Sequence, residues 1–400
     1  MNSRIAITHI GLCTPLGNSP EEVLPRLING DVSAMQWRDD LLFDAPTLVG
    51  CVDDKRLINI ADHLSLFACR NNRLLNTAAQ QLIPAVEQAK HRFGADRIGV
   101  VLGTSTSGIS KGEAALKYKL VHGHFPSSYH YSQQELGSTS EYLKQLFLLS
   151  GPCYTVSTAC SSSAKVFASA QRLLNANLCD MVIVGGVDSL CQLTVNGFAA
   201  LESVSKGHCN PFSRHRDGIN IGEGAALFTL ERGQSEVMLA GIGESADAHH
   251  ISAPHPQGTG AIAAMQQALA AANISPQQIN YVNLHGTATP KNDAMESRAI
   301  NAVFSHTSPP CSSTKPLTGH TLGAAGAIEA AFCYLLLSPL NHNQRLPPHV
   351  WDGQFDDNDP KISLVNGNCN TGQSQLNFIM SNSFAFGGSN ASLIFCRKDA

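Results

Sequence analysis

Two stretches of the chain repeat one pattern, and this repeat limits the folds that are open to it. Residues 152–170 and 310–330 each contain a short strand, a turn rich in Ser and Thr, a residue with reactive chemistry and a helix of small residues. Cys160 and His320 occupy equivalent places in the two copies. An internal repeat indicates duplicated supersecondary units that pack together. We therefore expect two related halves, with the starts of both helices near one site on a pseudo-two-fold axis.

The segment around Cys160 predicts a nucleophile. Apolar residues spaced by about 3.6 positions follow the cysteine, so a helix should begin close to it; they are Val166, Phe167, Ala170, Leu173 and Leu174. A thiol at a helix start faces unpaired backbone N–H groups and the positive end of the helix dipole. Both favour the thiolate, which is the nucleophilic form. The alternative is a buried structural cysteine, and the place of Cys160 between a strand and a helix argues against it.

Two histidines supply what an activated thiol needs. His285 ends an apolar strand, and His320 precedes a helix of small residues, each flanked by Gly and Thr. Neutral imidazoles in such places are good hydrogen-bond donors to a developing oxyanion. A nucleophile with two histidines suits acyl transfer.

Composition excludes several classes of function. Hydrophobic residues make up 43% of 400 residues, enough for a sizeable core. Only 14% of residues are charged and the net charge is −4, which argues against a nucleic-acid partner. We find no apolar run that could span a bilayer and no signal-peptide pattern, so we expect a cytoplasmic protein without a membrane span.

A metal site is not expected. The 12 cysteines form no C-x-x-C pair. His249, His250 and His255 lie close together in the sequence, but no cysteine or carboxylate stands at ligand spacing from them.

Strands alternate with helices along the chain, which is typical of α/β proteins. Predicted strands cover residues 4–10, 98–102, 181–184, 225–231, 237–241, 280–284, 376–381 and 391–397. Predicted helices cover residues 20–29, 73–93, 258–272, 293–304 and 324–337, besides the one after Cys160. We divide the chain into residues 1–235 and 236–400. Residues 33–60 read as irregular, and an insertion at residues 107–150 should cap an active site or build a dimer contact.

Ordered motifs from residue 7 to residue 390 carry a family resemblance. They include Thr158-Ala159-Cys160-Ser161-Ser162, Val184-Gly185-Gly186-Val187-Asp188, Gly222-Glu223-Gly224, His285-Gly286-Thr287-Ala288-Thr289 with Asn292-Asp293 and Glu296, residues 315–326, and Asn382-Ser383-Phe384-Ala385-Phe386-Gly387-Gly388. Over essentially its whole length the chain resembles the β-ketoacyl-acyl-carrier-protein synthases of the thiolase superfamily. The resemblance implies an α/β fold of two duplicated halves in an αβαβα layered arrangement. Its Cys-His-His set is similar to that of the elongating synthases rather than the initiating Cys-His-Asn type.

A narrower resemblance is to the ketosynthases of bacterial aryl-polyene pigment clusters. The segments that carry it are Arg70-Asn71-Asn72-Arg73-Leu74, Asp188-Ser189-Leu190-Cys191, Ser245-Ala246-Asp247-Ala248-His249-His250 and Leu346-Pro347-Pro348-His349. In those systems a synthase can pair with a related chain-length partner. Fatty-acid elongation and polyene synthesis both remain open.

The reaction implied by the resemblance is a decarboxylative Claisen condensation. An acyl group would form a thioester on Cys160, and the enolate formed from malonyl-carrier protein would attack it. His285 and His320 would hold the enolate oxygen, and the backbone N–H groups of Cys160 and Phe386 would form the oxyanion hole for the acyl carbon. Lys315 and Glu329 would orient the histidines and tune their protonation.

The resemblance also assigns the substrate path. Thr287 and Thr289 would hydrogen-bond the pantetheine amides. Ile109 and Phe198 would line the acyl pocket, and Phe386 would form its gate. No cofactor is implied, since the substrates are carried on the phosphopantetheine of an acyl carrier protein. The expected partners are that carrier and a second subunit, either an identical chain or a chain-length-factor-like homologue.

Two positions depart from the family pattern. Ala385 stands where the family usually has Gly. The added Cβ is expected to restrict the movement of Phe386 as the gate of the acyl pocket. Glu202 is nearest to a position that is often basic in the fatty-acid synthases. Carrier docking is then expected to use other cations, such as Arg70, Arg73, Lys206 and Arg214, or a differently charged carrier.

The sequence argues against two other functions. A thiolase needs a second reactive cysteine in the C-terminal turn, where this chain has residues 384–388 without one. A non-catalytic chain-length partner lacks the nucleophile and usually one or both histidines, whereas this chain keeps Cys160, His285 and His320.

Overall fold

The computed structural model describes residues 4–305, 308–367 and 375–400. Its strands are β1 Ile5–Cys13, β2 Met35–Arg38, β3 Thr47–Gly50, β4 Ile98–Gly103, β5 Cys153–Val156, β6 Met181–Asp188, β7 Gly224–Arg232, β8 Val237–Ala246, β9 Tyr281–Asn283, β10 Cys311–Ser312, β11 Phe378–Phe384 and β12 Ser389–Arg397. Its α-helices are α1 Pro20–Ile28, α2 Arg70–Ala79, α3 Ile83–Phe93, α4 Ile109–His122, α5 Ser138–Leu146, α6 Ser162–Asn175, α7 Gln192–Ala200, α8 Thr259–Ala272, α9 Pro290–Phe304, α10 Lys315–Thr318 and α11 Ala325–Leu337.

The main sheet shows the duplication directly. Its strand order is β10-β9-β11-β12-β8-β1-β7-β6-β4-β5, and the two halves meet where β1 pairs with β8. Outward from β1 the chain places β7, β6, β4 and β5; outward from β8 it places β12, β11, β9 and β10. In both series the first two pairings are antiparallel and the last two are parallel. The predicted duplication of an α/β unit is therefore confirmed, and the division proposed at residue 235 falls between β7 and β8.

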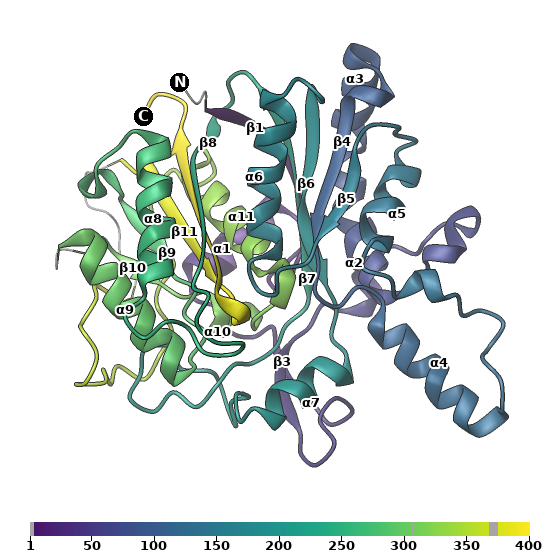
Figure 1. Ribbon diagram of the computed structural model, residues 1–400, viewed down its shortest axis with the longest axis horizontal. Helices are drawn as coiled ribbons and strands as arrows, with labels where there is room; N and C mark the ends of the chain where they lie inside the picture. Colours follow the sequence, from purple (N-terminus) through teal and green to yellow (C-terminus); the bar gives the residue numbers. More distant parts are fainter. Residues whose placement is uncertain (1–3, 306–307, 368–374) are drawn as a thin grey trace.

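Helices α6 and α11 lie between the two halves of the sheet. Helix α6 contacts β4 and β6 of the first half and β8 and β12 of the second, whereas α11 contacts β11 and β12 as well as β6 and β7. Helices α8 and α9 cover the outer face of the second half, and α2 and α5 cover that of the first (Figure 1). These contacts give the predicted αβαβα layers.

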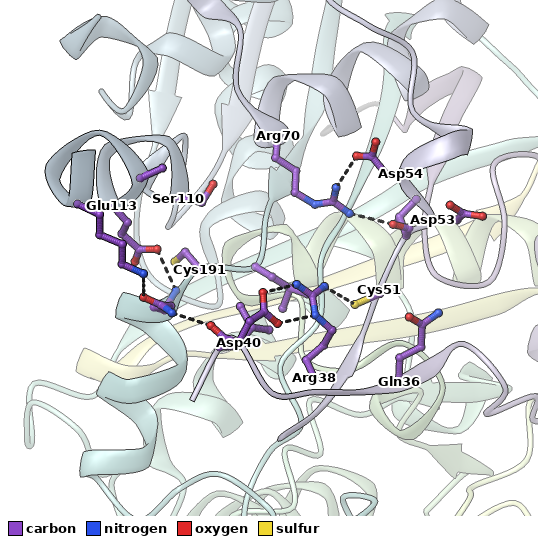
Figure 2. A pocket seen from close by; sticks show the side chains of 16 residues that line it. Gln36, Arg38, Asp40, Cys51, Asp53, Asp54, Arg70, Ser110, Glu113 and Cys191 are labelled. Atoms are coloured by element: carbon purple, nitrogen blue, oxygen red, sulfur yellow. Dashed lines mark hydrogen bonds and ion pairs between the residues drawn. The ribbon is translucent and has the colours of Figure 1, made fainter. Parts of the chain in front are cut away.

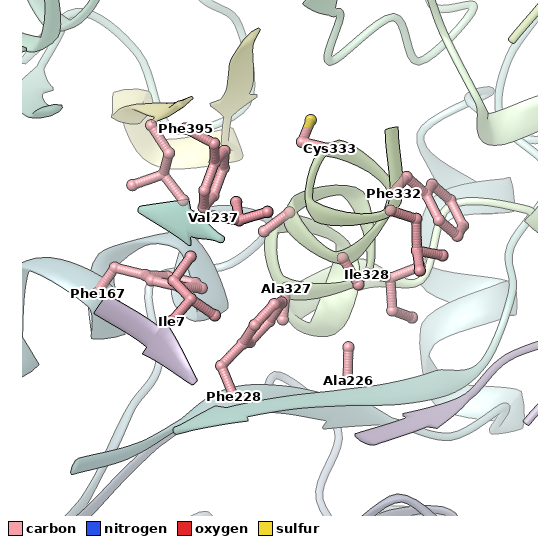
Figure 3. Close-up of a cluster of buried hydrophobic side chains, with 14 of the residues drawn as sticks. Ile7, Phe167, Ala226, Phe228, Val237, Ala327, Ile328, Phe332, Cys333 and Phe395 are labelled. Carbon is pink, nitrogen blue, oxygen red and sulfur yellow. The ribbon is translucent and has the colours of Figure 1, made fainter. Parts of the chain in front are cut away.

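The middle layer holds the largest apolar cluster. Ile328 and Phe332 of α11 belong to this cluster together with Phe228 of β7, whose ring lies against Ala327, and Phe167 of α6 packs with Phe395 of β12 (Figure 3). The Phe167 ring lies 5.2 Å from that of Phe228 and 6.1 Å from that of Phe395, both edge to face, an orientation that aromatic pairs favour. Because both halves contribute to this cluster, it fixes the two helix starts relative to each other.

Two local predictions were wrong. The helix predicted over residues 73–93 is interrupted at residues 80–82, and α3 resumes with Pro84 in its first turn, because proline cannot donate an N–H inside a helix. Residues 33–60 contain the hairpin of β2 and β3. Helix α7 was not predicted, because its apolar side chains are not gathered on one face of the helix. Within the described part of the chain, no helix is long and apolar enough to cross a membrane.

Candidate active site

Three side chains that lie far apart in the sequence converge on one site: Cys160 in the turn after β5, His285 just after β9, and His320 between α10 and α11. The Cys160 thiol and ring nitrogens of His285 and His320 all lie within 4.8 Å of one another, and all three residues are buried. Sγ of Cys160 is 3.1 Å from Nε2 of His320, and the two imidazole rings are nearly perpendicular, with centroids 5.4 Å apart. The predicted nucleophile and both predicted histidines are thus brought together.

A tight turn presents Cys160 between β5 and α6. Ala159 has a φ of 51°, an unusual conformation for a residue with a side chain, and α6 begins at Ser162, two residues after the cysteine rather than at it. The hydroxyl of Ser162 accepts the backbone N–H of Thr158 at 2.8 Å and closes this turn. Across the interface, a Cβ at Gly326 of α11 would lie 2.7 Å from a backbone atom of α6, so only glycine allows this approach.

Asp188 supports the turn at Cys160 through hydrogen bonds to residues that contact this turn. The carboxylate is fully buried and accepts hydrogen bonds from the hydroxyl of Thr104 and from both the N–H and the hydroxyl of Thr106, besides the N–H of Ser105. Ser105 in turn donates its hydroxyl to the carbonyl of Ala159. Burial raises the pKa of Asp188. This residue was only a family landmark in the sequence, and its role in holding the turn follows from the structure.

The hydrogen bonds around the histidines fix their tautomers. The backbone N–H of Leu322 donates to Nδ1 of His320 at 3.3 Å, and Nζ of Lys315 lies 3.4 Å from Nδ1 of His285. Since each Nδ1 accepts, each neutral ring carries its proton on Nε2. Burial, and after it the charge of Lys315, holds the pKa of both histidines well below the usual value, so both are neutral. Two N–H donors therefore face Cys160, and their use as donors to an oxyanion stays a prediction.

Lys315 connects His285 to a buried acid. Its Nζ lies 2.6 Å from Oε1 of Glu329 on α11 and donates to the backbone carbonyl of His285. Both side chains are almost completely buried. Burial raises the pKa of Glu329, and the charge of Lys315 opposes that rise. The lysine predicted from the motif is thus in place, paired with the predicted glutamate.

A second buried acid holds the backbone at His285. Glu296 of α9 accepts the N–H of His285 at 2.8 Å and the N–H of Gly286 at 2.7 Å. Gly286 has a φ of 39°, and a Cβ there would lie 2.6 Å from Cβ of Ser313. Burial raises the pKa of Glu296 to about 8. In the sequence Glu296 was only a landmark of the family motif, and its contact with the backbone at His285 follows from the structure.

The expected lowering of the thiol pKa was wrong for the resting pocket. Burial raises the pKa of Cys160 to about 11, and it outweighs both the charge of Lys315 and a hydrogen bond from the backbone N–H of Phe386. The reason is that removing a thiolate from water costs more than one helix start and one donor return. Cys160 is therefore a thiol at neutral pH before substrate binds.

The turn that carries Phe386 lies directly against the thiol. Gly387 and Gly388 both have positive φ angles, 81° and 75°, and the carbonyl of Gly388 accepts the N–H of Asp247. Ala385 has ordinary extended angles, so its Cβ causes no strain here. The rings of Phe386 and Phe198 lie 5.5 Å apart and together cover the cysteine.

The cavity at the three residues is small, about 20 Å³, and is lined by Cys160, Phe198, Ile219, His285, Thr287, Thr289, Asn292, His320, Phe384 and Phe386. A second cavity of about 260 Å³ shares Thr289 and Phe386 with it and extends to the exposed side chains of Leu201 and Lys291. The hydroxyls of Thr287 and Thr289 lie 2.9 Å apart; Thr289 lines both cavities, and Thr287 lines only the smaller one. The two cavities therefore adjoin beside the threonines.

Ile109 lies elsewhere in this chain. It lines a mainly apolar surface hollow of about 670 Å³ between α4 and α7 and does not border the cavity at Cys160. Its place in an acyl pocket stays a prediction.

Several of the basic side chains expected to bind a carrier protein form ion pairs within this chain. Figure 2 shows a polar cavity of about 530 Å³ in which Arg70 pairs with Asp54. Arg70 also donates to both oxygens of buried Glu223, at 2.6 and 2.8 Å, and Arg73 pairs with Asp54. Arg214 lies 3.7 Å from Asp357. Of the four expected cations only Lys206, which is exposed, has no ion pair within the described residues.

The chemistry of the three residues does not favour a metal ion. Zinc binds an imidazole through a lone pair, but both histidines present Nε2–H groups to the thiol. In the other tautomer, the ring N–H of His285 would point at Nζ of Lys315. That of His320 would point at the backbone N–H of Leu322. The prediction of no metal rests on this geometry and on the sequence.

Comparison with known families agrees with this geometry. Residues 2–236 match the model described as beta-ketoacyl synthase, N-terminal domain, and residues 237–350 match beta-ketoacyl synthase, C-terminal domain. The chain belongs to the β-ketoacyl synthase family. This result confirms the predicted family and agrees with the thiolase-like fold.

Similar members of the family cover the whole chain. The mitochondrial 3-oxoacyl-[acyl-carrier-protein] synthase of Arabidopsis thaliana is 31% identical, over 98% of this chain and 93% of the relative. The 3-oxoacyl-[acyl-carrier-protein] synthase 2 of Staphylococcus aureus is 30% identical, over 100% and 99%. Among solved structures, the ketosynthase ApeO from Xenorhabdus doucetiae, in complex with its chain length factor ApeC, is 44% identical with a TM-score of 0.93, covering 99% of this chain and 98% of that one.

This β-ketoacyl synthase carries an exposed apolar surface on the predicted insertion. Residues 107–150 contain α4 and α5, and large apolar side chains of α4 and its neighbours are uncovered: Phe43, Leu116, Leu120, Val121, Phe125 and Leu193. Helix α4 extends away from the body of the molecule (Figure 1). A contiguous apolar surface of this kind marks an interaction site.

Proposed function

We propose that this chain is an elongating β-ketoacyl-acyl-carrier-protein synthase that condenses malonyl-carrier protein with an acyl group held on Cys160. The observation that carries the proposal is the pairing of one buried thiol with two neutral imidazoles whose Nε2–H groups face it. A nucleophile beside preorganised donors stabilises the oxyanions of acyl transfer.

In the first half-reaction the sulfur of Cys160 attacks the carbonyl of an acyl-carrier thioester. The backbone N–H groups of Cys160 and Phe386 would stabilise the tetrahedral oxyanion. The carrier thiol then leaves with the proton that Cys160 gives up. The N–H donors of His320 and Phe386, which contact Sγ, favour the thiolate while it forms.

In the second half-reaction malonyl-carrier protein loses CO₂. The electron pair of the broken C–C bond forms an enolate, and its oxygen would accept hydrogen bonds from Nε2–H of His285 and His320. The enolate carbon attacks the acyl thioester on Cys160, the new C–C bond forms as the C–S bond breaks, and the cysteine leaves as the thiolate, which takes up a proton from solvent to restore the resting thiol. Lys315, held by Glu329, would keep His285 neutral and in the required tautomer.

The cavity of about 260 Å³ would receive the phosphopantetheine arm of the carrier. Thr287 and Thr289, which lie where this cavity adjoins the smaller one at the thiol, would hydrogen-bond the amides of the arm. The carrier itself would dock near the exposed Lys206 and Lys291. We keep the expected cytoplasmic location as a prediction.

A second subunit would cover the apolar surface of α4 and α7. The similarity to ApeO, a ketosynthase in complex with its chain length factor, favours a homologous chain-length-factor-like partner over an identical chain. The same similarity supports the aryl-polyene branch over fatty-acid elongation. The alternative that this chain is itself a non-catalytic partner is disfavoured, because Cys160, His285 and His320 are all present and lie close together.

The test is intact-mass analysis of carrier-bound products. The chain is incubated with malonyl-carrier protein and candidate primers, with and without co-purified partner, and Cys160→Ser is the control. A β-ketoacyl product lengthened by two carbons, absent with Cys160→Ser, is expected. Complete absence of lengthened product with every primer and partner would contradict the proposed function.

A further inference from the structure

A histidine outside the three reactive residues links two segments that border His285. His349 is 4% exposed. Its Nδ1 accepts the backbone N–H of Ser313 at 3.1 Å, and its Nε2 lies 2.9 Å from the carbonyl oxygen of Pro211. Because Nδ1 accepts, the neutral ring carries its proton on Nε2 and donates it to Pro211. Both ring nitrogens are thus bound to backbone groups, which leaves neither free for proton transfer.

The first of these segments controls the position of Lys315. The hydroxyl of Ser313 donates to the carbonyl of Gly286 at 2.7 Å. Oγ of Ser313 also accepts the backbone N–H of Lys315 at 3.3 Å. Ser313 therefore joins the residue after His285 to the start of α10. A shift of Ser313 would change the 3.4 Å distance between Nζ of Lys315 and Nδ1 of His285.

The second segment, which contains Pro211 and Phe212, also packs against Gly286. Phe212 has a φ of 62° and donates its N–H to Asp293 at 2.8 Å. A Cβ placed on Gly286 would lie 2.6 Å from Cβ of Ser313 and 3.0 Å from Cε2 of Phe212. Gly286 is therefore held between these two side chains, and His349 is bonded to the segments that carry both.

The surroundings of His349 keep its ring neutral and fixed. The ring packs edge to face against Phe212 and Trp351, with centroids 5.8 and 5.5 Å apart. Burial lowers the pKa of His349 to about 4, so the Nδ1 lone pair that binds Ser313 is available throughout the neutral range.

We propose that His349 is a positioning residue that sets the geometry of His285 and Lys315 for decarboxylation of the malonyl thioester. This inference rests on the proposed function. Acyl loading on Cys160 uses the α6 turn and the Phe386 turn, which Asp188 and Asp247 hold, and His349 contacts neither. A change at His349 should therefore affect one half-reaction and spare the other.

Three substitutions separate the contacts. His349→Leu removes both hydrogen bonds, His349→Asn offers an oxygen near the place of Nδ1, and His349→Gln offers an N–H near the place of Nε2. The measured quantity is the ratio of CO₂ release from malonyl-carrier protein to acyl loading on Cys160. Because small misplacements of catalytic groups cost about 10- to 100-fold in rate, His349→Leu should lower this ratio by about that factor. His349→Asn should restore more of it than His349→Gln, and Ser313→Ala should lower it as well.

The control is Ile362→Ala, which removes a buried side chain from the apolar cluster that also contains Phe212. It should reduce thermal stability without changing the ratio. If His349→Leu does not fold, His349→Asn and Ser313→Ala decide the question. The inference is overturned if the folded variants keep the ratio within twofold of wild type, or if Ile362→Ala lowers it equally. Failure of wild type to release CO₂ would instead contradict the proposed function.

Discussion

Sγ of Cys160 lies 3.1 Å from Nε2 of His320, although 160 positions of sequence separate the two residues. The two occupy equivalent places in the duplicated halves, each just before a helix of the middle layer. The contact therefore exists because α6 and α11 pack against each other across the pseudo-two-fold axis. In the resting pocket it joins a protonated thiol to a neutral imidazole.

Alkylation of Cys160 should accelerate steeply with pH. Its pKa is raised to about 11, so the thiolate fraction grows about tenfold for each pH unit below that value. Iodoacetamide labelling of the free enzyme, followed by peptide mapping, should show this slope between pH 7 and 9. A rate that levels off below pH 8 would indicate a thiol with an ordinary or lowered pKa. Cys160→Ser is the control for labelling of other cysteines.

His320→Ala should separate the two half-reactions. The variant should still accept an acyl group on Cys160, because the backbone donors of the oxyanion hole remain. Decarboxylation should fall by about 10² to 10³, the usual cost of losing one oxyanion donor. The measurements are the mass of acylated enzyme and the CO₂ released from malonyl-carrier protein. Normal CO₂ release would exclude the assigned role.

Decarboxylation should be insensitive to mild acid. The pKa of His285 and His320 lies well below the usual value, so the neutral forms are lost only when the pH falls through those lowered values. On enzyme already acylated at Cys160, the rate should change less than about twofold between pH 7 and 5.5. A histidine with an ordinary pKa near 6.5 would instead lose about eightfold over this range. A fall of that size would show that one imidazole becomes charged.

Leu120→Asp should prevent association with the second subunit. Leu120 on α4 is 79% exposed in the single chain, so the substitution should alter the free energy of unfolding of that chain by no more than about 0.5 kcal/mol. A buried carboxylate at an interface would be costly. Co-purification with the partner measures the effect. Leu178→Asp, which changes an exposed leucine outside the hollow, should leave association intact; equal loss in both variants would argue against this surface.

The sequence alone was sufficient for the family, the duplication and the three reactive residues. Those features depend on local patterns: a Ser/Thr turn before a small-residue helix at Cys160 and His320, and a strand that ends on His285. Such patterns involve residues that are close together in the sequence, so they can be recognised from residue types and their spacing alone. For the same reason most strands and helices were predicted within a few residues of their observed ends.

Only the tertiary structure decided the electrostatics and the supporting contacts. The pKa of Cys160 depends on how completely the thiol is removed from water, and local sequence does not encode burial. Glu296, Asp188 and His349 each stand in a motif that carries the family resemblance. Their hydrogen bonds reach backbone groups that are distant in sequence, so the motifs did not show what these residues hold in place. Local sequence placed Cys160 and His320 before helices and His285 at the end of a strand. Long-range packing decided which of these groups are charged and how firmly they are held.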